Sequence, residues 1–166
     1  MEMMDSLKKV CLENNNIGDS GAVALSKALE DNDTLLSIHL ESNEISREGA
    51  CSLGEMLSNK FKLSKLNLNN NPIGDEGFSK IAEGLQEIET LRIITLANTE
   101  ITKASIPSLS QSLQNKRFLT KLLLDNNKIG SEGANLLALG IQNNETLTNL
   151  HLANCQVGEE GAVAIA

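Results

Sequence analysis

Three residues whose types could support catalysis fall close together in the first third of the chain: Cys11, His39 and Glu41. A cysteine acts as a nucleophile when a neighbouring base takes its proton. The strands predicted below place Cys11 and His39 side by side on an open surface, with Glu41 nearby. Such a surface has no pocket that excludes water and no oxyanion donors, and one cysteine with one histidine provides too few ligands for zinc. We therefore expect no catalytic residue, no metal site and no cofactor.

The arginines and glycines give no sign of phosphoryl-transfer chemistry either. Activation of that reaction usually employs an arginine that reaches the developing charge, and Arg47, Arg92 and Arg117 all fall outside the outward-facing strand positions. The recurrent Gly-Asp-x-Gly segments lack the Lys-Ser/Thr ending of a phosphate-binding loop. We predict that the chain is not an enzyme.

Composition excludes several other classes of function. The 166 residues carry 14 basic and 22 acidic side chains, so a net charge of −8 argues against nucleic acid as a partner. No apolar run approaches the roughly 20 residues that a membrane-spanning helix needs. The segment 1–6 has neither the basic start nor the apolar stretch of a secretory signal. The three cysteines are spaced too far apart in the predicted fold to pair, which fits a reducing compartment. We expect an intracellular, cytoplasmic protein that binds neither nucleic acid nor membrane.

One repeat of 28 residues runs through the chain without a slip. Each of six units opens on a leucine, and these are Leu7, Leu35, Leu63, Leu91, Leu119 and Leu147. The same interval joins a second set of leucines, Leu12, Leu40, Leu68, Leu96, Leu124 and Leu152. A third set lies in the second half of each unit and comprises Gly21, Gly49, Gly77, Ser105, Gly133 and Gly161. We number the units 1 to 6 from their opening leucines.

Each unit combines a strand with a helix. Alternation such as Ile38-His39-Leu40 is typical of a strand with one buried face. In the second half, Ala22, Leu25, Ser26 and Leu29 recur with the spacing of a helical stripe. Neither half can bury its apolar face alone, so the units must stack. The pattern predicts an α/β fold in which a parallel sheet forms the concave face of a right-handed solenoid and helices form its convex face.

The pattern Leu-x-x-Leu-x-Leu-x-x-Asn-x-Ile, followed by Gly and Leu-x-x-x-Leu, resembles the ribonuclease-inhibitor-like class of leucine-rich repeats over residues 7–166. The resemblance implies a horseshoe-shaped arc of six repeats. It says less about function, because the class includes ribonuclease inhibitor, NOD-like receptors, tropomodulin and the Ran GTPase-activating protein.

Polar positions of the repeat have expected structural roles. After each strand, one position carries Asn15, Asn43, Asn71, Thr99, Asn127 and Cys155. We predict that the asparagines form a buried ladder of hydrogen bonds to neighbouring turns, and that Thr99 and Cys155 take the same place. We expect the repeated glycines to let each helix approach the sheet closely. Acidic residues such as Asp19 and Asp75 fall at helix starts, where the helix dipole favours negative charge.

The outward strand positions form three rows that a partner would meet. The first row is Lys9, Ser37, Lys65, Ile93, Lys121 and Asn149; the second is Cys11, His39, Asn67, Thr95, Leu123 and His151; the third is Glu13, Glu41, Asn69, Ala97, Asp125 and Ala153. Ile93 and Leu123 are apolar where the frame expects polar residues. They indicate either an apolar anchor with a polar rim or ordinary exposed aliphatic side chains. The candidate protein-binding residues are Lys65, Ile93, Thr95, Ala97, Lys121, Leu123, Asp125, His39 and His151.

Domain organisation follows from the same frame. Residues 1–166 form a single domain, and we expect it to be a fragment of a longer array because neither end carries a polar capping unit. The alternative is end-to-end association with another chain. Unit 4 departs from the pattern at Thr99, Ser105 and Pro107, which indicates a local bend, a binding loop or simple drift.

These observations favour a non-enzymatic module that binds a protein partner through its concave face and adjoining loops. Two alternatives rest on the resemblance alone: a regulator of a small GTPase, as in the Ran GTPase-activating protein, and a tropomodulin-like cytoskeletal binding domain.

Overall fold

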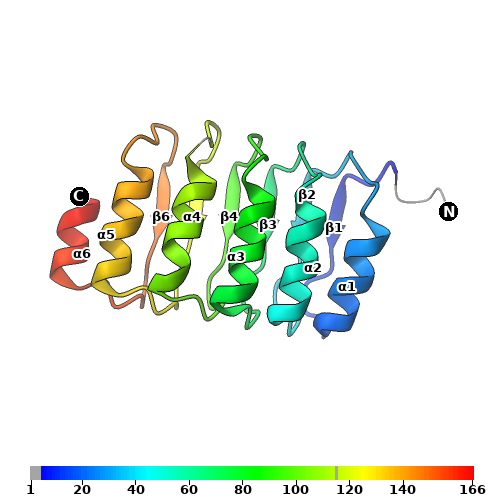
Figure 1. The fold of residues 1–166 in the computed structure, drawn as a ribbon, viewed down its shortest axis with the longest axis horizontal. Coiled ribbons are helices and arrows are strands. Elements are labelled where there is room, and N and C mark those ends of the chain that lie inside the picture. The colour runs from blue at the N-terminus through cyan, green and yellow to red at the C-terminus, as the bar shows by residue number, and fades with distance from the viewer. Residues whose placement is uncertain (1–4, 115) are drawn as a thin grey trace.

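The computed structural model describes residues 5–114 and 116–166, in which strands and helices alternate along one axis (Figure 1). The strands are β1 (Lys9–Cys11), β2 (Ser37–His39), β3 (Lys65–Asn67), β4 (Ile93–Thr95), β5 (Lys121–Leu123) and β6 (Asn149–His151). The helices are α1 (Gly18–Ala28), α2 (Arg47–Leu57), α3 (Gly74–Leu85), α4 (Ile106–Leu113), α5 (Gly130–Ile141) and α6 (Gly158–Ile165), with a 3-10 turn η1 (Lys103–Ser105) before α4.

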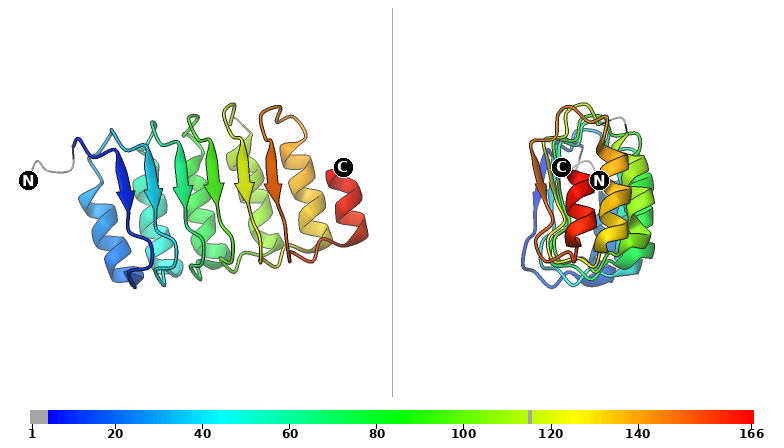
Figure 2. Two further views of the ribbon diagram at one scale, coloured as in Figure 1. Left: turned by 180° about the vertical axis from the view of Figure 1, so that it is seen from behind. Right: turned by 90° about the vertical axis from the view of Figure 1, so that its left-hand side faces the viewer.

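All six strands form one open parallel sheet in chain order. Each residue pairs with the residue 28 positions later, so Lys9 pairs with Ser37 and Ser37 with Lys65. The sheet forms one layer and the helices the other (Figure 2). The predicted α/β solenoid of six strand–helix units is therefore confirmed. We call the outward side of the sheet the strand face; it is the predicted concave face.

The core lies between the two layers. The central residue of each strand points inward, and Ile38, Leu66, Ile94 and Leu122 are buried. The following leucine of the repeat is buried as well in units 2 to 5, whereas its counterparts in units 1 and 6, Leu12 and Leu152, are only partly buried. No helix of the described residues is long and apolar enough to cross a membrane.

The predicted asparagine ladder is present. Asn71 Oδ1 accepts hydrogen bonds from the backbone N–H groups of Asn43 (3.1 Å) and Ile45 (3.0 Å), and its Nδ2 donates to the carbonyls of Leu40 (2.9 Å) and Leu68 (3.0 Å). One side chain thus satisfies backbone groups of two adjacent units. In unit 6, Cys155 takes this place.

Cys155 behaves as a structural residue. It is 1% exposed and its thiol donates to the carbonyl of Leu124 at 3.0 Å. Burial raises the pKa of the Cys155 thiol, so it stays protonated. Cys11 and Cys51 are also free, which agrees with the prediction that no pair forms.

Units 1 to 4 alternate between two kinds of helix start, a feature the sequence reasoning missed, whereas units 5 and 6 both begin at a glycine with positive φ, Gly130 and Gly158. In units 1 and 3 the helix begins at a glycine with positive φ, Gly18 (60°) and Gly74 (66°). In units 2 and 4 that position is Ser46 or Thr102, in extended backbone. Because glycine adopts positive φ at little cost, the two sequences favour different helix starts.

Equivalent contacts join unit 1 to unit 2 and unit 3 to unit 4. Asp19 Oδ1 accepts from the backbone N–H of Ser46 at 2.8 Å, and Asp75 Oδ1 accepts from that of Thr102 at 2.8 Å. The aspartates lie in first helical turns, as predicted, but they also fasten the next unit.

At the opposite end of the helices, buried lysines make the same connection. Lys60 and Lys116 are 1% and 2% exposed, and each Nζ donates at 2.9 Å to a carbonyl near the end of the preceding helix, that of Glu30 or Gln86. Burial lowers the pKa of both ammonium groups. These donors satisfy carbonyls that a helix end leaves without partners.

The expected role of the repeated glycines was wrong. A Cβ added at Gly49 would lie 2.9 Å from the Cβ of Ala22 in α1 and 2.9 Å from Ile45 Cγ2. At Gly77 it would lie 2.9 Å from the Cβ of Ala50 in α2. These glycines allow close approach of one helix to the preceding helix, and not of a helix to the sheet.

Candidate functional site

The strand face presents its outward residues in straight rows. Strand pairing aligns the first row as Lys9, Ser37, Lys65, Ile93, Lys121 and Asn149. It aligns the second as Cys11, His39, Asn67, Thr95, Leu123 and His151. Figure 2 shows the strands side by side across this face. The predicted positions therefore lie together as the repeat frame requires.

Ile93 and Leu123 form a small apolar patch. Ile93 pairs with Lys121, and Leu123 pairs with Thr95, so the two aliphatic side chains lie on diagonal positions of neighbouring strands. Both are half-buried, and Ala97 is likewise only partly exposed. Thr95 is buried, and its hydroxyl donates to Asn67 Oδ1 at 2.7 Å. Thr95, which pairs with Leu123, is thus held in place by a hydrogen bond beside the patch.

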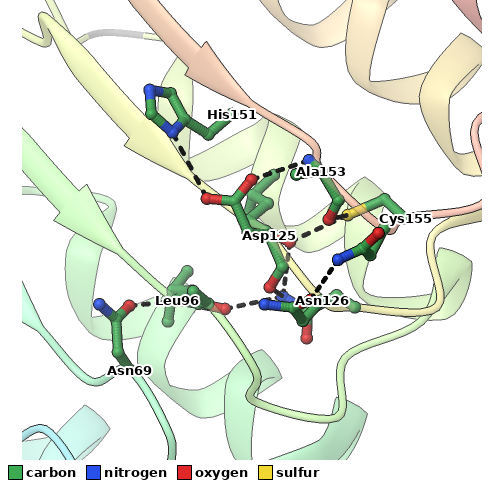
Figure 3. Close-up of polar contacts among 11 residues, drawn as sticks. Asn69, Leu96, Asp125, Asn126, His151, Ala153 and Cys155 are labelled. Carbon is green, nitrogen blue, oxygen red and sulfur yellow. Dashed lines mark hydrogen bonds and ion pairs between the residues drawn. The ribbon is translucent and has the colours of Figure 1, made fainter.

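Asp125 links β5 to the turn after β6 (Figure 3). Its Oδ1 accepts from the backbone N–H of Ala153 at 2.8 Å, and its Oδ2 lies 3.4 Å from His151 Nδ1. Asn69 makes the equivalent contact in unit 3, where its Oδ1 accepts from the N–H of Ala97 at 2.8 Å. These contacts join neighbouring units at two places in the third row, and the residue types alone did not predict them.

The other two carboxylates of the third row are also occupied. Glu41 accepts from Asn67 Nδ2 (3.0 Å) and from Asn70 Nδ2 (3.2 Å). Glu13 lies 3.7 Å from His39 Nδ1. Each carboxylate of the strand face therefore has a polar partner within the sheet.

The lysines of the first row differ in this respect. Lys65 and Lys121 are exposed, as is Lys9, and none of the three makes an ion pair with any residue of the described ranges. The first row therefore carries three ammonium groups without ion-pair partners, whereas the carboxylates of the third row keep their negative charge, and the chain as a whole is acidic.

The possible catalytic trio does not assemble. Cys11 and His39 are register partners on β1 and β2, as predicted. His39, however, pairs with Glu13, while Glu41 is hydrogen-bonded to Asn67. No group of three histidine, cysteine or acidic side chains suited to a metal occurs among the residues that the structure describes.

The arginines lie off the outward rows. Arg47 of α2 forms an ion pair with Glu76 of α3. Arg92 precedes β4, and its guanidinium lies 5.3 Å from the ring centre of Phe118, a cation–π contact. Arg117 is exposed before β5. His39 and His151 stand on β2 and β6 with separate acidic partners, so they do not form one site.

Comparison with known proteins adds three findings. A family model described as "Leucine Rich repeat" matches residues 6–26, 59–82, 115–138 and 143–166, which is more than half of the chain. A solved structure titled "Leiomodin-1 Actin-Binding Site 2 (ABS2)" is similar with a TM-score of 0.52 and 19% identity, covering 89% of this chain and 71% of that chain. No curated protein matches the sequence. At this identity, the structural likeness shows the fold alone.

Proposed function

Since the chain belongs to the leucine-rich-repeat family, we propose that it is a non-enzymatic module of the ribonuclease-inhibitor-like class that binds a protein partner through its strand face and adjoining loops. The observation that carries this proposal is the half-buried pair Ile93 and Leu123 at the centre of a polar surface. Apolar centres with polar rims are typical of protein interfaces.

The pair is well placed to contribute affinity. Full burial of one aliphatic side chain is worth about 1.5–3 kcal/mol. A partner that covers the remaining exposed parts of Ile93 and Leu123 gains less than that amount in total, because both side chains are already partly buried. Lys65, Lys121 and Asp125 surround the pair and supply polar contacts at its rim. His39 and His151 extend the surface on either side.

The test uses the double variant Ile93→Lys/Leu123→Glu in affinity capture from source-cell lysate, with the bound proteins quantified by mass spectrometry. A matched control is Leu139→Lys, which changes an exposed leucine of α5 on the helical side. Circular dichroism first establishes that all proteins are folded. We expect the partner to be retained by wild type and control and reduced about tenfold by the double variant. Equal retention by all three contradicts binding through the strand face.

A cytoskeletal partner is the second candidate, and the likeness to the leiomodin actin-binding structure is the observation that favours it. Co-sedimentation with filamentous actin and a pointed-end elongation assay test it directly. We expect binding or slowed elongation that the double variant removes. An unchanged elongation rate and no co-sedimentation eliminate actin as the partner.

Regulation of a small GTPase has weaker support, since no arginine stands in the outward rows. Unchanged single-turnover hydrolysis across a panel of small GTPases eliminates it.

A further inference from the structure

The free positive charge of the strand face is regularly spaced. Lys9, Lys65 and Lys121 occupy one row, on strands β1, β3 and β5, with no ion-pair partner among residues 5–114 and 116–166. The three carboxylates of the same face each have a polar partner within the sheet. A partner segment that lies along the first row therefore meets three ammonium groups without ion-pair partners, which favours acidic side chains in that segment.

The row also contains an apolar position. Ile93 pairs with Lys65 on one side and with Lys121 on the other, so it lies midway between two lysines. Adjacent strands are about 4.8 Å apart, which places consecutive lysines of the row about 9.6 Å apart. The pattern along the row is thus lysine, serine, lysine, isoleucine, lysine, with Leu123 beside its last members.

This spacing distinguishes between the shapes that a partner segment can take. In an α-helix, residues i and i+7 lie on one face and about 10.5 Å apart along the axis, close to the lysine spacing. In an extended strand, residues on the same face are about 6.7 Å or 13 Å apart, and neither value matches. A helix lying across the strands therefore matches the lysine spacing more closely than an extended peptide does.

We propose that the strand face binds an amphipathic α-helix of a partner protein. This helix carries Asp or Glu at i, i+7 and i+14, opposite Lys9, Lys65 and Lys121, and an aliphatic residue at i+10 or i+11, opposite Ile93. This inference rests on the proposed function and names the chemistry of the partner for the same site.

Two labelled synthetic helices of about 22 residues test the inference by fluorescence anisotropy. The first has glutamates at i, i+7 and i+14 and leucine at i+11. The second has the same composition with the glutamates moved to the opposite face. We expect the first peptide to bind the full chain about tenfold more tightly than the second, and its affinity to fall as sodium chloride is raised.

The protein variants complete the design. Lys65→Glu/Lys121→Glu reverses the charge of two row positions, and Lys27→Glu makes the same change on α1, on the helical side. Thermal unfolding followed by circular dichroism verifies the fold of each. The row variant is expected to lose about tenfold in affinity for the first peptide, and the α1 variant to bind like wild type.

Three results overturn the inference: equal affinity for the two peptides, no effect of the row variant, or no binding of the first peptide at about 1 mM. Its failure is distinguishable from failure of the proposed function. A captured partner that depends on Ile93 and Leu123 but tolerates the row variant preserves the strand face as the binding site and removes the acidic helix. A partner that tolerates both variants removes the strand face itself.

Discussion

Asn71 shows how one side chain can hold two repeat units together. Its amide makes hydrogen bonds to backbone groups of units 2 and 3 and is fully buried. Asn71→Ala leaves these buried groups without partners, and we expect the free energy of unfolding to fall by about 3–5 kcal/mol in urea denaturation. Asn143→Ala, at an exposed turn, is the matched control and should change it by less than about 0.5 kcal/mol. A loss below about 1 kcal/mol at Asn71 contradicts the ladder's importance.

Asp75 provides a prediction of pH dependence. Burial raises the pKa of Asp75, but the hydrogen bonds donated by Ser105 and Thr102 together lower it by more. The net result is a pKa below the ordinary value of an aspartate. A carboxylate with a lowered folded-state pKa stabilises the protein above the unfolded-state pKa. This stability is lost as the pH falls through the folded-state pKa.

Asp75→Asn tests this reasoning. We expect the variant to be about 1–3 kcal/mol less stable than wild type at pH 7. The difference should shrink as the pH falls from about 5 to 2, because the wild-type carboxylate becomes protonated. Urea denaturation of both proteins across this range gives the measurement. A difference that stays constant with pH means that the carboxylate charge does not contribute.

At the scale of elements, α2 and α3 approach each other through two glycines. A Cβ added at Gly84 would overlap the carbonyl oxygen of Gly54, and one added at Gly54 would overlap the carbonyl of Lys80. Alanine has a helix propensity about 1 kcal/mol better than glycine. We nevertheless expect Gly84→Ala to lower the free energy of unfolding by about 1–3 kcal/mol, because backbone atoms must move apart.

Thermal unfolding by calorimetry or circular dichroism checks the Gly84 prediction. Ser79→Ala on the same helix is the control, since Ser79 makes no side-chain hydrogen bond within the described residues. It should leave the midpoint nearly unchanged. A stabilised Gly84→Ala protein would mean that propensity outweighs the close packing of the two helices.

The sequence alone predicts some features of the strands and helices and misses others. The register of the strands was predictable, because a constant interval of 28 fixes it, as the pairing of Lys65 with Ile93 illustrates. The strand ends were not, since the third-row residues, such as Ala97 and Asp125, lie just after the three-residue strands. The helix starts were not, because they depend on φ at Gly18 and Gly74 and on contacts between units. The partners of Asp75 and Lys116 were equally hidden, since each lies in another unit about 30 residues away.

The sequence likewise predicts one part of the candidate site and not the other. Which side chains face outward follows from strand alternation, so the diagonal placement of Ile93 and Leu123 was predictable. Which charged groups have partners is a matter of side-chain geometry, which the sequence did not show. Glu41 and Asp125 accept hydrogen bonds within the sheet, whereas Lys65 has no ion-pair partner in the described ranges.

At the scale of the whole molecule, stability should vary along the array. In a stack of repeats each unit contacts only its neighbours, so local opening depends on how many neighbours a unit has. Leu122 of unit 5 is fully buried, whereas Leu150, at the same position in unit 6, is only partly buried. Unit 6 of the 166-residue chain therefore buries less apolar surface and should open at a lower free-energy cost.

Amide hydrogen exchange can test this gradient at equivalent hydrogen bonds. The N–H of Leu96 donates to the carbonyl of Leu123 at 2.8 Å, and the N–H of Leu124 donates to that of His151 at 2.9 Å. The two bonds have nearly the same geometry but differ in the acceptor's unit. We expect the Leu124 amide to exchange at least about tenfold faster, because opening of unit 6 releases its acceptor. The Leu68 amide, bonded to Thr95 at 3.0 Å, should match Leu96. Equal exchange at all three would mean that the array opens only as one cooperative body, and that coupling between adjacent units exceeds the difference in their burial.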